Sequence, residues 1–296
     1  MIQITDKFLR PLLLYRNNDS HKYNYGHALL VCGCERMPGA AVLATGAALK
    51  SGCGLVSLHS TATAVSAAMA SNPSAMLSRD SGECFSKVPE NLNRYDAIGV
   101  GPGLGREECT VEALKELLSQ AKKESKTMVL DADALNIIAE HPDLLTMVPA
   151  GSVLTPHSGE LRRLSRAIES SVHGEVGASS DSPSLDDAAM RLAERLGCVV
   201  VSKGWHTKVF VPTDSINVFE NTTGNAGLAK GGSGDVLTGL ITGLIARGYK
   251  AADAALLGVW LHGYAGDCLT KDFTAEAWNS QDLLPRLYEG FKLLYL

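Results

Sequence analysis

Short aliphatic runs alternate with longer helical stretches along most of this chain, and that order limits the fold more than any other feature. The expected strands are residues 28–32, 55–59, 97–101, 128–131, 153–155, 199–202, 208–211 and 216–219. The expected helices are residues 40–51, 110–123, 185–196, 236–247 and 251–269. Strands that alternate with helices predict a mostly parallel sheet covered by helices on both faces. The predicted fold class is therefore α/β.

The last two expected strands are separated only by residues 212–215, which predicts an antiparallel hairpin at one edge of the sheet. Residues 170–184 are rich in Ser and Gly, as linkers and surface loops are. The alternation resumes directly after them, so we interpret this segment as a surface loop. Residues 1–296 are expected to form one domain, although two domains also fit this length.

Charge and hydropathy exclude two classes of protein. The chain has 27 basic and 32 acidic residues, a net charge of −5, and no long basic run. A protein that follows the phosphate backbone of nucleic acid needs such a run, so we expect no nucleic-acid partner. No stretch of about 18 uncharged apolar residues occurs, and residues 1–22 lack the features of a signal peptide. We expect a cytoplasmic protein without a membrane segment.

Seven cysteines are scattered through the sequence. Their odd number and the apolar neighbours of Cys32 and Cys198 predict reduced, buried thiols. Cys32 and Cys34 lie close together, but no second Cys/His pair follows at the spacing of a zinc site. A structural metal is therefore not expected here.

Residues 221–239 are the most informative for function. Five glycines fall within the eleven residues 224–234, directly before a long apolar helix. Glycines let backbone N–H groups approach an anion, and a helix N-terminus adds free donors and a favourable dipole. We predict that Gly232, Ser233 and Gly234 form an anion hole for a transferring phosphoryl group. The spacing matches neither a Walker A loop nor a dinucleotide-binding loop.

Asp235 lies in the first turn of the helix that follows these glycines. There the helix dipole is expected to hold its carboxylate ionised. An ionised carboxylate beside a phosphate-binding loop can accept the proton of an attacking hydroxyl. A plain N-cap is the alternative, because Asp is a preferred cap residue. We favour a catalytic base, since a cap needs no dense glycine loop.

Three more loops follow expected strands, at the edge where open α/β sheets bind ligands. Residues 101–105 (Gly-Pro-Gly-Leu-Gly) either approach a ligand or form a tight turn. Asp131 and Asp133 provide carboxylates that suit Mg²⁺ bound through water, unless Asp133 caps the next helix. His157 is a candidate hydrogen-bonding residue, whereas Glu160 falls in the first turn of a helix, where the dipole favours an acid.

Residues 203–207 end the strand before the expected hairpin. They are candidates for contacts to an adenine nucleotide, and the alternative is an ordinary turn with an exposed aromatic ring. His262 and Asp267 lie in the last long expected helix, five residues apart. We expect these two to serve packing or capping.

Together these motifs resemble the NAD(P)H-hydrate dehydratase family of the ribokinase-like superfamily. The matching segments run in family order from about residue 26 to residue 267 and include GPGLG, LDADALN, LTPHSGEL, SKGWHT and GNAGLAKGGSGDVLTG. GGSGD is shared by many ribokinase-like kinases, whereas LDADALN together with TPHSGEL is much more specific. The resemblance implies a three-layer α/β/α ribokinase-like fold.

The resemblance also implies an activity, which is the nucleotide-dependent dehydration of hydrated NADH and NADPH (NADHX and NADPHX). It implies ADP or ATP as co-substrate, with ADP slightly preferred, and Mg²⁺ as cofactor. A kinase of a small alcohol or vitamin precursor is the alternative, since it would share the glycine loop and Asp235. These residues include no fused epimerase domain, so a separate NAD(P)HX epimerase is an expected functional partner. The family commonly assembles into homo-oligomers.

Matched motif by motif, the resemblance assigns roles to individual residues. Asp235 would be the catalytic base. Contacts to the hydrate would fall on Ala41, Gly103, His157 and Asp235. Contacts to the adenine nucleotide would fall on Lys203, Gly204, Trp205, His206, Thr207 and Gly234. Lys230 replaces a commonly seen Thr, and residues 170–184 look longer than the family's usual loop, so the preferred nucleotide stays open.

Overall fold

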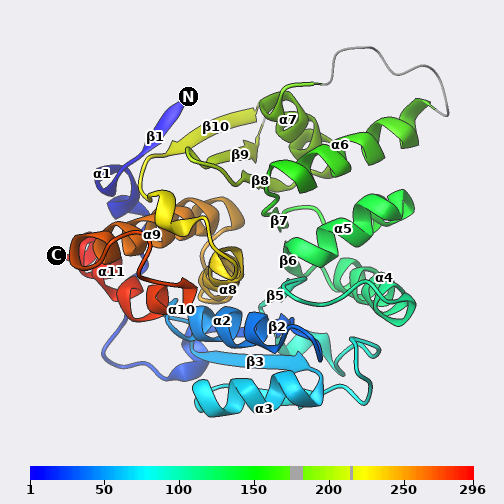
Figure 1. Cartoon of the computed structure of the whole chain (residues 1–296), viewed down its shortest axis with the longest axis horizontal. Coiled ribbons are helices and arrows are strands. Elements are labelled where there is room, and N and C mark those ends of the chain that lie inside the picture. The colour runs from blue at the N-terminus through cyan, green and yellow to red at the C-terminus, as the bar shows by residue number, and fades with distance from the viewer. Residues whose placement is uncertain (174–182, 214–215) are drawn as a thin grey trace.

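The computed structural model describes residues 1–173, 183–213 and 216–296, and its strands form one sheet with helices on both faces (Figure 1). The strands are β1 (Ile2–Ile4), β2 (His27–Val31), β3 (Leu55–Ser60), β4 (Met76–Arg79), β5 (Ala97–Val100), β6 (Thr127–Leu130), β7 (Val153–Leu154), β8 (Val199–Ser202), β9 (Lys208–Pro212) and β10 (Ile216–Asn221). Their order is β1-β10-β9-β8-β7-β6-β5-β2-β3-β4. Strand β9 runs antiparallel to both its neighbours, and the other pairs are parallel.

Two hydrophobic cores hold the three layers together, one on each face of the sheet. The α-helices are α1 (Asp6–Leu9), α2 (Pro38–Leu49), α3 (Ala62–Ser71), α4 (Glu108–Lys123), α5 (Ala132–Glu140), α6 (Ser158–His173), α7 (Leu185–Leu196), α8 (Ser233–Ala246), α9 (Ala251–Asp272), α10 (Ser280–Leu283) and α11 (Leu287–Tyr295). Helices α2, α3, α8, α9 and α11 contribute to one core, and α4 to α7 to the other. The α/β prediction is confirmed.

Helix α8 lies in the middle of its layer and is buried from Val236 to Ala246. Its sequence is apolar on every side, as is typical of a helix enclosed by other elements. Gly239 permits the close packing of α2 on α8, because a Cβ there would lie 2.0 Å from the carbonyl oxygen of Ala44. This packing fixes the position of the first turn of α8, which carries Asp235.

The eight expected strands are all present, with ends within one or two residues of those predicted. The expected edge hairpin is β9–β10, but it does not form the edge itself, because β1 pairs with β10 in parallel. Strands β1 (IQI) and β4 (MLSR) were not expected, since neither is a continuous apolar run like the buried strands. Most of the predicted surface loop 170–184 lies outside the described residues. Among the described helices, none is both long and apolar enough to cross a membrane.

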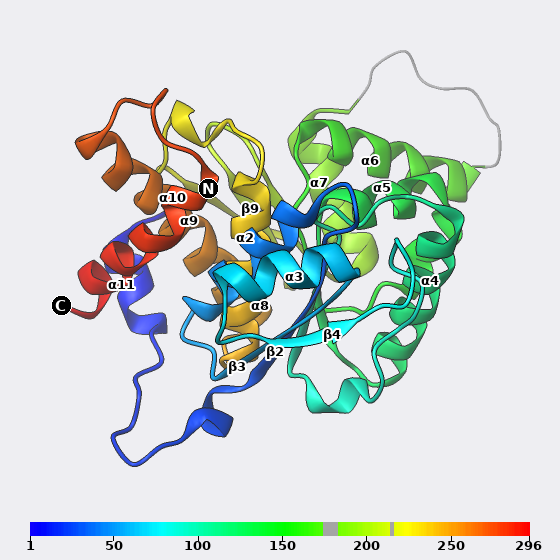
Figure 2. The same ribbon diagram turned by 60° about the horizontal axis from the view of Figure 1, so that its bottom comes forward.

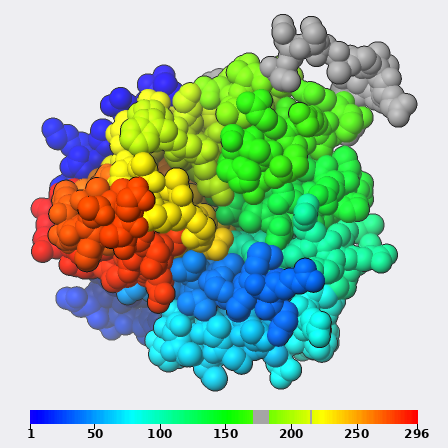
Figure 3. All heavy atoms as spheres, in the orientation of Figure 1, coloured from blue at the N-terminus to red at the C-terminus, as the bar shows by residue number. Residues whose placement is uncertain are grey.

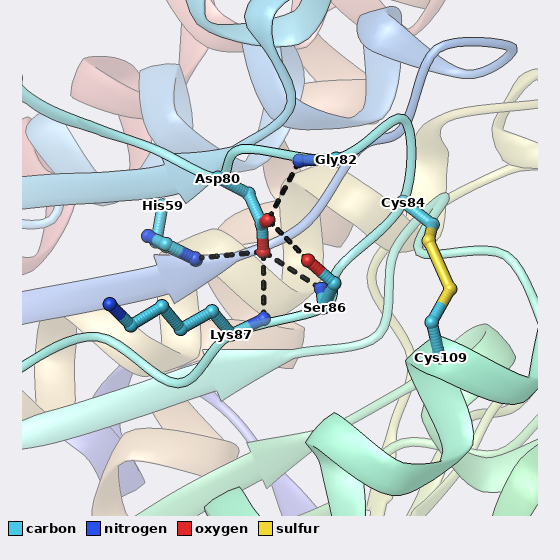
Figure 4. Close-up of a disulfide and its surroundings, with 7 residues drawn as sticks. All are labelled: His59, Asp80, Gly82, Cys84, Ser86, Lys87 and Cys109. Atoms are coloured by element: carbon cyan, nitrogen blue, oxygen red, sulfur yellow. Dashed lines mark hydrogen bonds and ion pairs between the residues drawn. A yellow bond between two sulfur atoms is a disulfide. The ribbon is translucent and has the colours of Figure 1, made fainter.

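The prediction that all cysteines are reduced thiols was wrong. Cys84 and Cys109 form a disulfide (Figure 4), whereas the other five cysteines are free. The pair is separated by 25 residues and joins the loop after β4 to the start of α4. A tertiary contact of this kind leaves no mark in the spacing of the cysteines.

Candidate functional site

The sequence-predicted loops meet at the carboxyl edge of the sheet, beside the first turn of α8. The strand order reverses between β2 and β5, and such switch points are where open α/β sheets bind ligands. A Cβ on Gly234 would lie 3.2 Å from Lys203 Nζ and 3.4 Å from Asp131 Oδ2. The ends of β6 and β8 therefore reach the glycine loop. In Figure 3 this loop, coloured yellow, reaches the surface next to α2, coloured blue.

Free backbone donors occur at the start of α8. Gly232 is the N-cap residue and has a φ of +90°, a conformation that favours glycine. Within the described part of the chain, the N–H groups of Gly232, Gly234 and Asp235 donate to no protein acceptor. The Ser233 N–H donates to the carbonyl of Lys230 at 3.3 Å. An anion would therefore be held by Gly232, Gly234 and Asp235 rather than by Ser233.

Two residues of α9 hold the glycine loop in place. The buried His262 Nε2 lies 3.1 Å from Ser233 Oγ. Burial lowers the pKa of His262 to about 4, so its imidazole is neutral at pH 7. Asp267 accepts hydrogen bonds from the Gly224 N–H (2.9 Å) and from Asn225 Nδ2 (3.0 Å). These contacts go beyond the packing or capping role that we expected for His262 and Asp267.

Lys230 also serves the loop. Its ammonium group donates to the backbone carbonyls of Ala275 (2.7 Å) and Trp278, and it lies 4.8 Å from the centre of the Trp278 ring. The lysine therefore ties the glycine loop to the connection between α9 and α10. Its charge is directed at protein groups in this structure.

The carboxylate of Asp235 has an unusual environment. Burial raises its pKa to about 6, and the negative charges of Asp131 and Asp133 act in the same direction, against the positive charge of Lys203. We expected the helix dipole to hold this carboxylate ionised. Burial opposes the ionised form, but with a pKa of about 6 the group is still mostly ionised at pH 7. A pKa just below neutral suits a general base.

A partly buried ion pair lies beside Asp235. Lys203 Nζ is 2.6 Å from Asp131 Oδ1, and the Thr238 hydroxyl donates to Asp131 Oδ2 at 2.8 Å. Asp131 is only 1% exposed. Asp133 is turned away, because it accepts the Gly105 N–H at 2.9 Å, so it holds the loop before α4 instead of capping α5.

The expected Mg²⁺ site at these two carboxylates does not fit the structure. Both oxygens of Asp131 have protein partners, and one oxygen of Asp133 does as well. Among the described residues, no group of three or more His, Cys, Asp or Glu side chains could hold a metal ion.

Gly103 and the start of α2 form another side of the site. Gly103 has a φ of +58°, and a Cβ there would lie 2.7 Å from the Cβ of Ala40 and 2.9 Å from that of Met37. Ala40 is 9% exposed, whereas Ala41 is fully buried and faces Gly33. A ligand at Gly103 would therefore meet Ala40 first.

His157 pairs along the backbone with Lys203, at the ends of β7 and β8. Its side chain is half exposed, and its Nδ1 accepts the Gly159 N–H at 2.9 Å. Burial together with the charges of Lys203 and Arg163 lowers the pKa of His157. Glu160 lies 3.3 Å from His157 Nε2, accepts the His157 N–H and has a pKa raised to about 7 by burial. This carboxyl group was expected only to respond to the helix dipole.

Residues 203–207 form a turn closed by Thr207, whose hydroxyl bonds to the N–H and carbonyl groups of Gly204. Trp205 is 71% exposed, and its ring meets that of His206 edge-on at 5.7 Å. An exposed indole ring two residues after Lys203 offers a stacking surface for a planar group.

The sequence matches known proteins over nearly its whole length. The model of the NAD(P)H-hydrate dehydratase family matches residues 28–288. A bifunctional NAD(P)H-hydrate repair enzyme of Moorella thermoacetica is 36% identical over 292 residues, which are 95% of this chain and 52% of that protein. The chain thus spans about half the length of such bifunctional relatives. An ADP-dependent (S)-NAD(P)H-hydrate dehydratase of Neisseria meningitidis is 37% identical, covering 86% of this chain and 81% of that protein.

Solved structures agree with this similarity. An ADP/ATP-dependent NAD(P)H-hydrate dehydratase from Bacillus subtilis, co-crystallised with ATP and Mg²⁺, superposes with a TM-score of 0.79 at 29% identity. The match covers 99% of this chain and 98% of that one. A ribokinase-like superfamily protein of Enterococcus faecalis gives a TM-score of 0.80 at 27% identity, over 99% and 96% of the two chains.

Proposed function

The chain belongs to the NAD(P)H-hydrate dehydratase family, and from this premise we propose that it converts NADHX and NADPHX to NADH and NADPH in metabolite repair. ADP or ATP supplies the phosphoryl group, with ADP slightly preferred. The observation that carries the proposal is the first turn of α8. There, free N–H donors lie beside a carboxylate with a pKa of about 6.

The chemistry explains why a nucleotide is needed. Hydroxide is a poor leaving group from the C6 carbon of the hydrated ring, and phosphate is a good one. The C6 oxygen attacks the terminal phosphorus of ADP or ATP, which releases AMP or ADP, while Asp235 takes the hydroxyl proton. The lone pair of the ring nitrogen then expels phosphate, and loss of a proton from C5 restores the dihydropyridine.

Structural observations support the contacts proposed for Gly232, Gly234, Lys203 and Trp205. The N–H groups of Gly232 and Gly234 are free to stabilise the phosphoryl oxygens. Lys203 places a cation beside Gly234. The exposed ring of Trp205 offers a stacking face for adenine. The remaining proposed contacts are His206 and Thr207 on the nucleotide and Gly103 and His157 on the hydrate. At the start of α2 the hydrate contact falls on Ala40 in place of the expected Ala41, because Ala41 is fully buried.

Mg²⁺ is proposed only as a companion of the nucleotide. The ion prefers phosphate oxygens and water to a cage made of protein ligands. The Bacillus subtilis relative was co-crystallised with both ATP and Mg²⁺. The steps above are those that the protein's own groups carry out. A homo-oligomeric state and a separate NAD(P)HX epimerase remain proposals drawn from the family.

One assay tests the activity. The purified protein is incubated with NADHX, Mg²⁺ and either ADP or ATP, and the absorbance of reduced nicotinamide is followed together with released phosphate. We expect absorbance to rise only with nucleotide, and phosphate to appear in equal amount. Nucleotide consumption that yields a stable phosphorylated alcohol, without NADH, would instead identify the small-alcohol kinase.

A further inference from the structure

A cavity of about 360 Å³ lies at the end of α8 opposite Asp235. Its walls come from the N-terminal segment, the turn after α2, the turn after α8 and helix α11. Figure 2 shows the N-terminal segment, coloured blue, running beside α11. Helix α8 has 14 residues and is therefore about 20 Å long. The cavity is thus separate from the site proposed above.

Three cations line this cavity, namely Arg16, Lys50 and Arg247, and no Asp or Glu does. The chain as a whole carries a net charge of −5, so the positive charge of this cavity is opposite in sign to that of the whole protein. A concave surface with several positive charges and no acid attracts anions.

Arg247 is the most informative of the three. It is only 8% exposed, and buried arginines are normally paired with an acid. Its guanidinium donates to the Leu14 carbonyl at 2.9 Å and lies 4.4 Å from the centre of the Tyr25 ring. Arg16 lies 4.0 Å from the same ring and donates to the Gly52 carbonyl at 2.6 Å. Among the described residues, no carboxylate forms an ion pair with either arginine.

Both guanidinium groups contact the Tyr25 ring, and a Cβ on Gly52 would lie 3.3 Å from Arg247 Nε and 4.0 Å from Arg16 Nη2. Positive charges this close repel each other, and a bound anion beside them would relieve that repulsion. Each guanidinium presents a planar fork of N–H donors, a geometry that matches the oxygens of a phosphate group. Lys50 adds a third, mobile charge at the rim.

Aromatic side chains form most of the remaining wall. Tyr15 is 69% exposed, and its ring meets that of Tyr295 edge-on at 5.1 Å. The Phe291 ring is 6.5 Å from that of Tyr295. These rings offer apolar faces to a planar group, and the volume lies within the range of small-molecule sites.

Helix termini explain only part of this arrangement. Lys50 and Arg247 occupy the C-cap positions of α2 and α8, where the helix dipole favours a cation. Arg16 lies outside any helix, and a dipole requires neither its charge nor the open volume in front of it. We propose that this cavity is a second ligand site, which binds an aromatic phosphate monoester of the size of a nucleoside monophosphate.

Calorimetric titration of the full chain with phenyl phosphate tests this site without relying on turnover. We expect saturable binding that is tighter than that of inorganic phosphate. The exposed pair Arg16→Glu/Lys50→Glu should weaken it by about tenfold or more, because two charge-assisted contacts are reversed. The matched control Lys115→Glu/Lys123→Glu makes the same charge change on α4, and it should bind as the wild type does.

Tyr15→Ala tests the aromatic part separately. It should weaken phenyl phosphate while leaving inorganic phosphate unchanged. Uridine monophosphate identifies the source, since tighter binding than phenyl phosphate points to nucleotides and equal binding to simple aryl phosphates. The proposal is overturned if phenyl phosphate does not bind, or if the Arg16→Glu/Lys50→Glu variant binds it as the control does. It is also overturned if this charge reversal changes only the oligomeric state.

Discussion

Asp80 is buried and Asp235 is partly buried, and their surroundings shift the pKa values of the two carboxyl groups in opposite directions. Asp80 is 1% exposed, and burial alone would raise its pKa. Hydrogen bonds from the Ser86 hydroxyl and from the N–H groups of Gly82, Ser86 and Lys87 lower that pKa to about 2 (Figure 4). Among the described residues Asp235 has no comparable donors to its carboxylate, and burial raises its pKa to about 6.

The difference separates a structural carboxylate from a reactive one. Asp80 organises the loop that carries Cys84, and His59 Nε2 lies 3.4 Å from it. Burial lowers the pKa of His59, so its imidazole is neutral at pH 7 and adds no charge. Each oxygen of Asp80 is thus satisfied by the protein itself. Asp235 has free proton-accepting capacity beside free N–H donors, which is what a base at a phosphoryl-transfer site needs.

The largest expected effect is on turnover. Asp235→Asn should lower kcat of the dehydratase reaction by about 10³-fold, because the proton of the attacking hydroxyl loses its acceptor. Circular dichroism and nucleotide binding should match the wild type. The exposed Asp19→Asn variant is the control and should keep normal turnover. Near-normal turnover in folded Asp235→Asn protein would rule out the base assignment.

Lys203→Met should lower the free energy of unfolding by about 3 to 5 kcal/mol, because it leaves the carboxylate of Asp131 buried without its cation. Urea denaturation at pH 7 measures this. The double variant Lys203→Met/Asp131→Asn should recover part of the loss. A double variant that is less stable than the single one would show that the ion pair is not the source of the effect.

The disulfide lies in the same loop that Asp80 organises, because Cys84 is part of that loop. Cys84→Ser should reduce the free energy of unfolding by about 3 kcal/mol, since the crosslink closes a span of 25 residues in the unfolded chain. Turnover at 25 °C should be unchanged. Equal stability of wild type and variant under oxidising conditions would show that the crosslink does not form in solution.

The smallest expected effects are on the free energy of unfolding, and they compare Asp80 and Asp235 directly. Asp80 has a folded-state pKa below its unfolded value, so it stabilises the protein above about pH 4, and this is lost as pH falls toward 2. Asp80→Asn should therefore cost about 2 kcal/mol at pH 7. Asp235 has a raised pKa, so its ionisation lowers stability, and this loss develops as pH rises from about 4 and is complete above about pH 6.

Asp235→Asn should accordingly increase the free energy of unfolding by about 2 kcal/mol at pH 8 and leave it unchanged at pH 4. Denaturation curves at the two pH values give both results. If both variants changed stability in the same direction at neutral pH, the proposed contrast between the two carboxylates would be lost.

Sequence patterns predicted the α/β architecture because buried parallel strands such as 97–100 and 199–202 are continuous apolar runs with clear ends. The short edge strands β1 and β4 lack that signal. The hairpin was placed correctly in sequence but not at the edge, because its pairing with β1 joins residues about 215 positions apart.

For the site, glycine spacing located the first turn of α8, since the need for close backbone approach is visible in the sequence. The raised pKa of Asp235 could not be predicted from the sequence, because desolvation depends on how α8 packs and on where Asp131 lies. The roles of His262 and Asp267 were missed for a similar reason. Their five-residue spacing in a helix gave no hint that Ser233 and Gly224 would lie beside them.

The pH dependence of kcat/KM for NADHX dehydration tests the central claim most directly, because it reports the pKa of the essential base in the free enzyme. With Asp235 as the base, the rate should rise from pH 5 and level off above a pKa of about 6. A profile that stays flat between pH 5 and 8, or that falls as pH rises, would contradict the account.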